Sequence, residues 1–301
     1  MSQAVAPESR LQKAAQLTIF WLKTSRPGLY FQWVWLYLLP VAGTDAHASQ
    51  VFWLGLFFAT APLSLLVYGW NDLADRELDR HNPRKDSFLF GARGEPWQLR
   101  TLPAAIVAVN LPCFVWLVSR GGLEMALVLA GVVAVNAAYN HPRWGLRGRP
   151  PFELVNELGV LLLVHLSVLL NDVPQLPWQT YLYLYVFTVH AHLVGEVMDL
   201  EPDRKGGRRT VALALGRFWT KTVIVALVAF ECSLLLFVFG DLVLAAILAA
   251  GLVWLLADLF VLFKDRVYTV GEMRLFGIAM NIAGYGTILW ALYAGTFSRV
   301  N

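Results

Sequence analysis

Long apolar runs separated by short polar segments make up most of the chain. A run of about twenty apolar residues is long enough to cross the hydrocarbon core of a bilayer as a helix. The pattern predicts an all-α integral membrane protein with nine transmembrane helices in one domain, residues 1–301. The expected spans are 27–43, 50–71, 101–118, 123–140, 152–170, 178–198, 219–239, 242–262 and 274–296.

The N-terminal segment has a different pattern. Residues 1–24 begin polar and then mix apolar side chains with lysine. This mixture is typical of a short amphipathic helix at the membrane interface. We therefore expect residues 1–24 to form an interfacial segment that leads into the first span.

Composition supports a membrane location. Hydrophobic residues make up 57% of the chain and charged residues 15%, and the mean hydropathy is +0.55. A soluble domain carries about 25% charged residues. No arginine-rich region suggests nucleic-acid binding. Cys113 and Cys232 lie in separate apolar runs, which favours buried thiols over a zinc or redox pair.

Lysine and arginine predict how the spans are oriented. Of the 24 basic residues, the predicted topology places only Arg120 and Arg299 on the side opposite the N-terminus. Basic residues concentrate on the cytoplasmic side of membrane proteins. We therefore expect a protein of a bacterial-type inner membrane. Its N-terminus and the loops 72–100 and 199–218 would be cytoplasmic.

An acidic stretch, NDLADRELDRHNPRK, follows the second apolar run. Asp72, Asp75 and Asp79 are spaced by three and four residues, so they would share one face if the helix continues. Clustered carboxylates repel one another unless a cation lies among them. Mg²⁺ commonly binds one or two carboxylates together with substrate phosphates. The stretch therefore predicts a metal–phosphate site at a helix end.

The acidic spacing occurs a second time, after the sixth span. Glu196, Asp199 and Asp203 stand 124 residues after the first three carboxylates, and Glu196 replaces an aspartate. The two copies predict two four-helix repeats plus one helix around a central cavity, with both motifs on one side. Six carboxylates would form an open cage for divalent cations and a diphosphate. The alternative is solvated Asp–Arg pairs that only neutralise each other.

Basic residues follow each motif. Arg84 and Lys85 come after the first copy, and Arg208 and Arg209 after the second. Guanidinium groups can bind phosphate oxygens in a bidentate manner. Alternatively, these residues serve only to fix the loops in the cytoplasm.

The paired motifs resemble those of the UbiA superfamily of intramembrane prenyltransferases. The motifs read Asn71-Asp72-x-x-Asp75-x-x-x-Asp79 and Asp199-x-x-x-Asp203, and Arg26-Pro27 and GRRTVALALG at 207–216 add to the likeness. The resemblance implies that Mg²⁺ binds the diphosphate of an isoprenyl donor, the allylic C–O bond ionises, and a lipophilic acceptor captures the cation. It implies catalytic carboxylates at Asp72, Asp75, Asp79, Asp199 and Asp203, with Glu196 as a further metal ligand.

A third segment indicates which branches of the family the chain resembles. Residues 139–150, YNHPRWGLRGRP, are similar to a run in the branches that prenylate chlorophyllide or extend carotenoids. NPRK at 82–85 followed by Gly91-Ala92 resembles the carotenoid-extending branch, with a longer insert. The alternative for residues 139–150 is a plain helix end. The residues expected at the diphosphate or acceptor are Asn71, Arg84, Lys85, Tyr139, Arg143, Arg147, Arg208 and Arg209.

Several polar residues fall inside the predicted spans, where they usually face a cavity or a polar partner. His192 precedes Glu196 by four residues and could orient that carboxylate. For Glu231 and Asp258 we expect roles in packing or at helix ends. For His165 and His190 we expect a hydrogen bond between packed helices. For Asn136, Asn156 and Glu157 such a bond is the alternative.

These patterns favour a membrane prenyltransferase that uses Mg²⁺, an isoprenyl diphosphate and a lipophilic acceptor in the lipid bilayer. A terpene cyclase of the same family, acting on the diphosphate alone, is the alternative. A divalent-cation transporter or a carrier of lipid-linked phosphates is a third hypothesis. The predicted outer loops are short and nearly free of carboxylates, which disfavours a continuous cation path.

Overall fold

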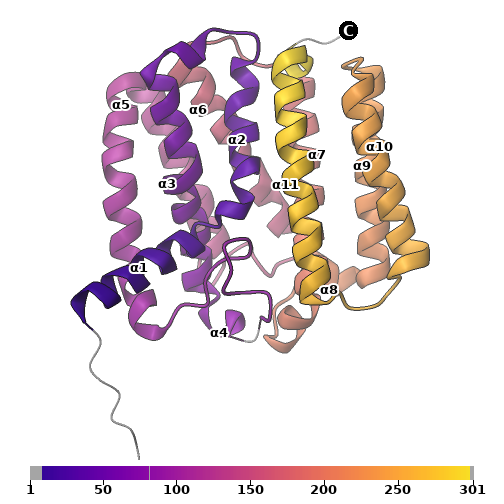
Figure 1. The fold of residues 1–301 in the computed structure, drawn as a ribbon, viewed down its shortest axis with the longest axis horizontal. Helices are drawn as coiled ribbons and strands as arrows, with labels where there is room; N and C mark the ends of the chain where they lie inside the picture. Colours follow the sequence, from indigo (N-terminus) through magenta and orange to yellow (C-terminus); the bar gives the residue numbers. More distant parts are fainter. Residues whose placement is uncertain (1–8, 81, 299–301) are drawn as a thin grey trace, which may run out of the picture.

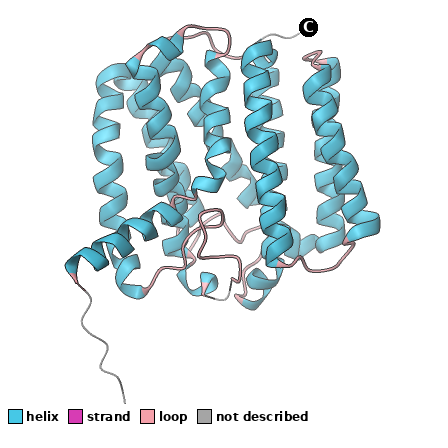
Figure 2. Ribbon diagram, in the orientation of Figure 1, coloured by secondary structure: helices cyan, strands magenta, loops and turns pink. Residues whose placement is uncertain are grey.

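The computed structural model describes residues 9–80 and 82–298. Within these ranges the chain is all-helical, and an isolated bridge between Ser87 and Gly91 is the only β pairing. The long helices run side by side in one bundle (Figure 1). One end of the bundle carries α4 (Arg76–Asp79), α8 (Val211–Leu215) and long loops (Figure 2). We call it the loop end.

The chain enters the bundle through α1 (Arg10–Thr24), which crosses the loop end (Figure 1). Ser9 and Gln12 form a capping box that satisfies free N–H groups at the start of α1. The predicted interfacial segment thus contains a helix. Residues 1–8 of that segment lie outside the described ranges. The location of the segment at the membrane interface stays a prediction.

Only part of the first predicted span is a regular α-helix. Only α2 (Tyr30–Leu38) is α-helical, between the 3-10 turns η1 (Pro27–Leu29) and η2 (Leu39–Val41). Pro27 and Pro40 lie in these turns. Proline lacks the N–H that an α-helix interior requires, which explains why the regular helix is short.

Two of the predicted spans form one long element. α5 (Pro96–Asn140) breaks at Gly122, whose backbone has φ 60 and ψ −144. The predicted spans 101–118 and 123–140 therefore lie on either side of this glycine. The preceding polar loop is shorter than expected, because α3 (Gln50–Ala74) extends past residue 71 and α5 starts at Pro96.

The remaining elements complete the bundle. They are η3 (Ala46–Ala48), η4 (Phe152–Val160), α6 (Leu161–Asn171), α7 (Trp178–Lys205), α9 (Arg217–Phe237), α10 (Leu242–Ala257), the π turn η5 (Asp258–Leu262), α11 (Val270–Ala294) and η6 (Thr296–Ser298). In Figure 1, α9 and α10 lie together at one side, and α11 lies between them and α2.

Among the described residues, six helical segments are long and apolar enough to cross a membrane. This finding indicates an integral membrane protein. The nine-span count, the two repeats, the central cavity and the cytoplasmic orientation stay predictions. The six segments are Gln50–Ala74, Pro96–Asn140, Phe152–Asn171, Arg217–Phe237, Leu242–Leu262 and Val270–Ala294.

Hydrogen bonds between buried polar groups hold together the helices that position the first motif. The hydroxyl of the fully buried Tyr37 donates to Phe52 O at 2.9 Å, and Ser167 Oγ donates to Tyr37 O at 2.6 Å. A Cβ at Gly55 would lie 2.2 Å from Tyr37 Oη, so glycine permits the close approach of α2 and α3. These contacts tie α2, α3 and α6 together.

Asp258 begins the π turn η5 and joins three segments near the loop end. Its Oδ1 accepts from Lys221 Nζ at 2.9 Å, and its Oδ2 accepts from the Tyr268 hydroxyl at 2.6 Å. Buried ion pairs are held in place when hydrogen bonds satisfy both partners. This arrangement matches the packing role expected for Asp258.

Candidate active site

The first acidic motif lies where α3 ends and α4 begins. Asp72 is in the last turn of α3, Asp75 is the junction with φ −99 and ψ 8, and Asp79 is in α4. The helix does not continue through the motif, because the chain turns at Asp75, so the condition for one shared helical face is not met. All three side chains are nevertheless buried, with exposed fractions of 4%, 7% and 8%.

The second motif lies on an unbroken helix. α7 continues to Lys205, so the expected loop from residue 199 begins later than predicted. Glu196, Asp199 and Asp203 share one face of α7 because they are spaced by three and four residues.

The two motifs meet at the loop end. Asn82 Nδ2 donates to Asp199 Oδ1 at 2.9 Å, and Arg84 pairs with the other oxygen of Asp199. Arg208 pairs with Asp75 of the first motif and lies 3.5 Å from Asp203 Oδ1 of the second. Segments more than a hundred residues apart in sequence therefore share one polar site.

Basic side chains fill the space between the carboxylates. Asp72 Oδ1 accepts from Arg26 Nη2 at 2.6 Å and from Lys85 Nζ at 2.7 Å. Lys85 Nζ also lies 2.7 Å from Asp79 Oδ2, and Arg147 Nη1 lies 2.6 Å from Asp75 Oδ1. Buried carboxylates require such partners. The site is therefore a neutralised network of acids and bases.

The donor atoms of the acidic motifs are oxygens, the type of ligand that a hard cation binds. Within residues 9–80 and 82–298, no three His, Cys, Asp or Glu side chains are close enough together to hold a metal ion. Asp72 Oδ2, Asp203 Oδ1 and Asn71 Oδ1 are buried without hydrogen-bond partners. Mg²⁺ prefers such oxygen ligands. Asp72 Oδ2 and Asp203 Oδ1 come from different motifs, and Arg208 lies within ion-pair distance of the second. The residues therefore fit Mg²⁺ if the basic side chains release the carboxylates.

Glu196 has protein partners on both oxygens. Its Oε2 accepts from the backbone N–H of Ala212 at 2.9 Å, and its Oε1 lies 3.2 Å from His192 Nε2. His192 Nδ1 lies 2.8 Å from Glu157 Oε1. His192 thus contacts Glu196 as its spacing suggested. Asp199 also has partners on both oxygens, so the bond from a backbone N–H is what distinguishes Glu196.

The other residues predicted from the sequence differ in whether they contact the network. Arg143 and Arg209 are exposed and form no ion pair within the described part of the chain. Tyr139 packs edge-on against the His192 ring, with centroids 6.4 Å apart. Tyr139 and Arg147 therefore lie at the network, whereas Arg143 and Arg209 lie outside it.

The sequence reasoning did not assign Arg26 and Asn82 to the site. Arg26 has a left-handed backbone, φ 51, and its guanidinium lies 4.4 Å from the Tyr68 ring centroid while it binds Asp72. A Cβ at Gly91 would lie 2.8 Å from Arg26 Nε, so the loop needs glycine there. The only sequence signals were the Arg26-Pro27 pair and NPRK at 82–85.

Burial changes the proton affinity of two carboxylates outside the predicted spans. It raises the pKa of Asp79 to about 6, although Lys85 opposes the shift. It raises the pKa of Asp203 to about 7, against the effect of Arg208. In the metal-free protein both groups bind protons more tightly when folded, so their contribution to the free energy of unfolding decreases as pH rises through about 6 and about 7.

We expect Mg²⁺ to bind at least about tenfold more weakly at about pH 5.5 than at about pH 8. Below their raised pKa values, Asp79 and Asp203 are protonated, and the cation must displace these protons. Calorimetric titration of the purified protein with Mg²⁺ measures the effect. A dissociation constant that does not change with pH would contradict it.

The fold and site define an all-helical membrane protein with two carboxylate motifs joined by basic side chains. The chain belongs to the UbiA prenyltransferase family, whose model matches residues 33–269. It is therefore a prenyltransferase.

Relatives point to the carotenoid-extending branch. The chain is 31% identical over 234 residues to a lycopene elongase/hydratase of Haloferax volcanii, a match that covers 72% of each chain. It is 26% identical over 211 residues to a lycopene elongase/hydratase of Corynebacterium glutamicum, which covers 69% of this chain and 70% of the relative.

Solved structures share the fold. A UbiA homolog from Archaeoglobus fulgidus bound to DMAPP and Mg²⁺ has a TM-score of 0.69 at 17% identity, covering 91% of this chain and 99% of that one. The apo structure of a UbiA homolog from Aeropyrum pernix K1 has a TM-score of 0.52 at 18% identity, covering 93% and 96%.

Proposed function

We propose that this prenyltransferase moves an isoprenyl group from an isoprenyl diphosphate to a lipophilic acceptor, by ionisation of the donor to an allylic cation. The observation that carries the proposal is the contact between the two acidic motifs. Arg208 spans Asp75 and Asp203, and Arg84 and Asn82 bind Asp199. A site with both acids and bases from two segments suits a metal–diphosphate group.

The proposed ligands of Mg²⁺ are the carboxylates with the fewest backbone partners. When bound, the cation would neutralise charge on the leaving diphosphate. Glu196 would instead hold the start of α8 through Ala212. The five proposed ligands are Asp72, Asp75, Asp79, Asp199 and Asp203.

The basic side chains would then act on the diphosphate. In this structure each basic side chain pairs with a carboxylate. A bound diphosphate would become the partner of the basic side chains, and a bound cation would become the partner of the carboxylates. Cationic donors fixed in a buried site stabilise charge that develops on the leaving group. The proposed donors are Arg26, Arg84, Lys85, Arg147 and Arg208, with Asn71 and Tyr139 beside them.

The names of the relatives support a proposal for the acceptor class. Their name, lycopene elongase/hydratase, describes extension and hydration of an acyclic polyene. We propose an acceptor of this class, held among the apolar helices, where exclusion of water protects the allylic cation. We further propose that the whole chain is one domain, with the loop end in the cytoplasm where soluble donors arrive.

Product analysis tests the proposal. The purified protein with Mg²⁺ would receive DMAPP or GPP, with and without lycopene or a cellular lipid extract. We expect the mass of a prenyl-extended acceptor only when acceptor is present. Cyclic hydrocarbons or alcohols formed from the donor alone would contradict transfer and favour the cyclase alternative.

A further inference from the structure

A second pair of ionisable side chains lies inside the bundle, away from both motifs. His190 on α7 and Glu231 on α9 are buried, and His190 Nδ1 lies 2.5 Å from Glu231 Oε1. The other oxygen, Glu231 Oε2, is buried without any hydrogen-bond partner. Ionisable groups inside a membrane are costly and usually functional. An unpartnered carboxylate oxygen at this depth therefore requires an explanation beyond helix pairing.

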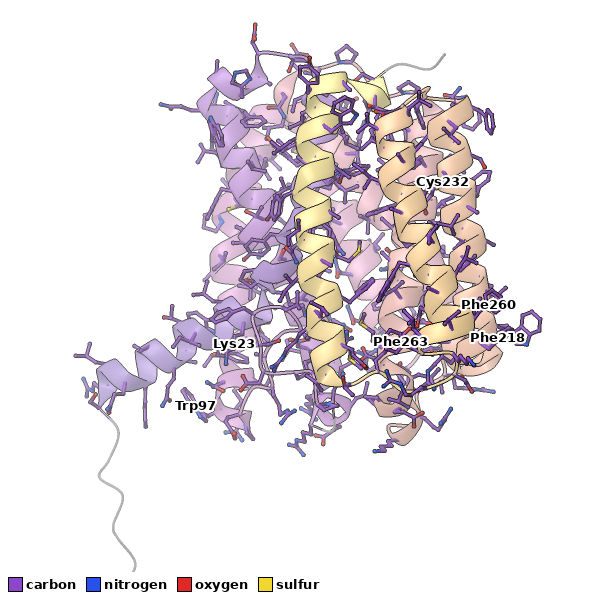
Figure 3. All side chains as sticks on the ribbon, turned by 45° about the vertical axis from the view of Figure 1, so that its right-hand side comes forward. Lys23, Trp97, Phe218, Cys232, Phe260 and Phe263 are labelled. Atoms are coloured by element: carbon purple, nitrogen blue, oxygen red, sulfur yellow. The ribbon has the colours of Figure 1, made fainter. Side chains whose placement is uncertain are left out.

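The pair lies deeper in the bundle than the acidic motifs. His190 precedes Glu196 by six residues and Asp199 by nine, which correspond to rises of roughly 9 Å and roughly 14 Å along α7. Cys232, which follows Glu231, lies far from the loop end (Figure 3). A donor whose diphosphate is bound at the motifs would extend its apolar tail toward this level. The reacting end of an apolar acceptor would approach from the same side.

A row of aromatic rings leads away from the His190 side of the pair. The His190 ring lies edge-on to Phe187 with centroids 5.2 Å apart, and Phe187 stacks on Trp35 of α2 at 5.5 Å. Trp35 also contacts Tyr183, with centroids 6.2 Å apart. Phe187 itself is half-buried. Aromatic faces stabilise cations. The structure thus combines a carbocation-tolerant wall with a base that has a free oxygen.

We propose that Glu231, held by His190, accepts the proton that ends prenyl transfer to an alkene acceptor; this rests on the proposed function. When the allylic cation adds to a C=C bond, the two π electrons form the new C–C bond and the other acceptor carbon becomes cationic. A proton on the adjacent carbon then moves to Glu231 Oε2. Its C–H electron pair becomes a new C=C bond, and the carboxylate becomes a carboxylic acid.

Removal of the base should change which product forms. Glu231→Gln keeps the size of the side chain and a hydrogen bond to His190 but cannot accept the proton. With DMAPP, Mg²⁺ and lycopene, we expect the alkene adduct formed per diphosphate released to fall at least about tenfold. Water would capture the longer-lived cation, giving an adduct heavier by one water. Mass spectrometry of the products and a diphosphate assay measure both quantities.

Two further variants separate catalysis from structure. Glu231→Asp retains a carboxylate and should still form mainly the alkene adduct, and Cys232→Ala is the matched neutral change on the same helix. If Glu231→Gln does not fold, the double variant His190→Phe/Glu231→Met replaces the whole pair with apolar groups, a change that proteins often tolerate. It must show the same shift toward the water adduct.

Three results would overturn the inference. The first is an unchanged product ratio in the variant that folds. The second is a parallel fall in diphosphate release and alkene adduct, which indicates a structural role. The third is a wild-type protein that forms only the water adduct. A wild-type protein that releases no diphosphate would instead overturn the proposed function, and this inference with it.

Discussion

Asp72→Asn is expected to lower the rate of prenyl transfer about a thousandfold. Asp72 Oδ2 is buried without a hydrogen-bond partner, and Asp72 Oδ1 contacts both Arg26 and Lys85. Loss of a carboxylate that holds a catalytic cation costs several kcal/mol of transition-state stabilisation, and each 1.36 kcal/mol is about tenfold in rate. The measurement is initial diphosphate release from DMAPP at saturating Mg²⁺.

The fold of this variant should survive. Asparagine keeps an oxygen that can accept from Arg26, and Lys85 keeps its contact with Asp79. Glu77→Gln is the matched control, because Glu77 lies in the same acidic stretch but its side chain is 66% exposed. We expect Glu77→Gln to retain the wild-type rate. Wild-type turnover in Asp72→Asn would show that Asp72 holds no essential cation.

Arg208→Met is expected to lower kcat/KM for the donor about a hundredfold. Arg208 is the side chain that contacts both motifs, at Asp75 and Asp203. Burial alone would lower the pKa of Arg208, but these two carboxylates raise it, so the guanidinium stays charged. A buried guanidinium binds phosphate oxygens as a rigid fork. Methionine keeps much of the apolar stem and removes the fork.

The control for Arg208 lies nearby on α7. Arg204 pairs with Glu201 at 2.9 Å, but its side chain is 61% exposed. Arg204→Met should therefore leave kcat/KM within about twofold of wild type, because exposed pairs contribute little. Arg208→Lys should recover only part of the loss, since a single ammonium group cannot replace the fork. Equal effects in the Arg204 and Arg208 variants would contradict a specific role for Arg208.

The meeting of the two motifs could be anticipated because its signal is a repeated spacing. Glu196, Asp199 and Asp203 lie on one continuous helix, where spacing determines the face. The turn at Asp75 was not predictable, because no glycine or proline marks it. Beyond this turn, Asp79 pairs with Lys85 at 2.7 Å.

Other features of the site could not be predicted, because they depend on contacts between segments that are distant in sequence. Arg26 reaches Asp72 from 46 residues away, and Asn82 reaches Asp199 from 117 residues away. Neither residue type reveals such partners in sequence. Hydropathy predicted where apolar helices lie but not their form, because 3-10 turns at Pro27 and at Phe152–Val160 are as apolar as α-helix. The break at Gly122 was expected as a boundary between spans.

The surroundings of His190 and Glu231 could be predicted only in part from the sequence. His190 was expected to form a hydrogen bond between packed helices, and Glu231 to pack or lie at a helix end. The two side chains pair with each other between α7 and α9. The free Oε2 of Glu231 and the rings of Phe187 and Trp35 became visible only with all side chains in place. A sequence pattern cannot show which oxygen of a carboxylate lacks a partner.

The most direct test of the central claim is Mg²⁺-dependent diphosphate release by the purified protein in lipid or detergent. The protein would receive DMAPP or GPP together with a lipid extract that contains lycopene. We predict release that requires Mg²⁺, stops when the cation is chelated, and is lost in both Asp72→Asn and Asp199→Ala. Absence of release from either donor, or equal release after chelation of Mg²⁺, would contradict a metal–diphosphate site at the two motifs.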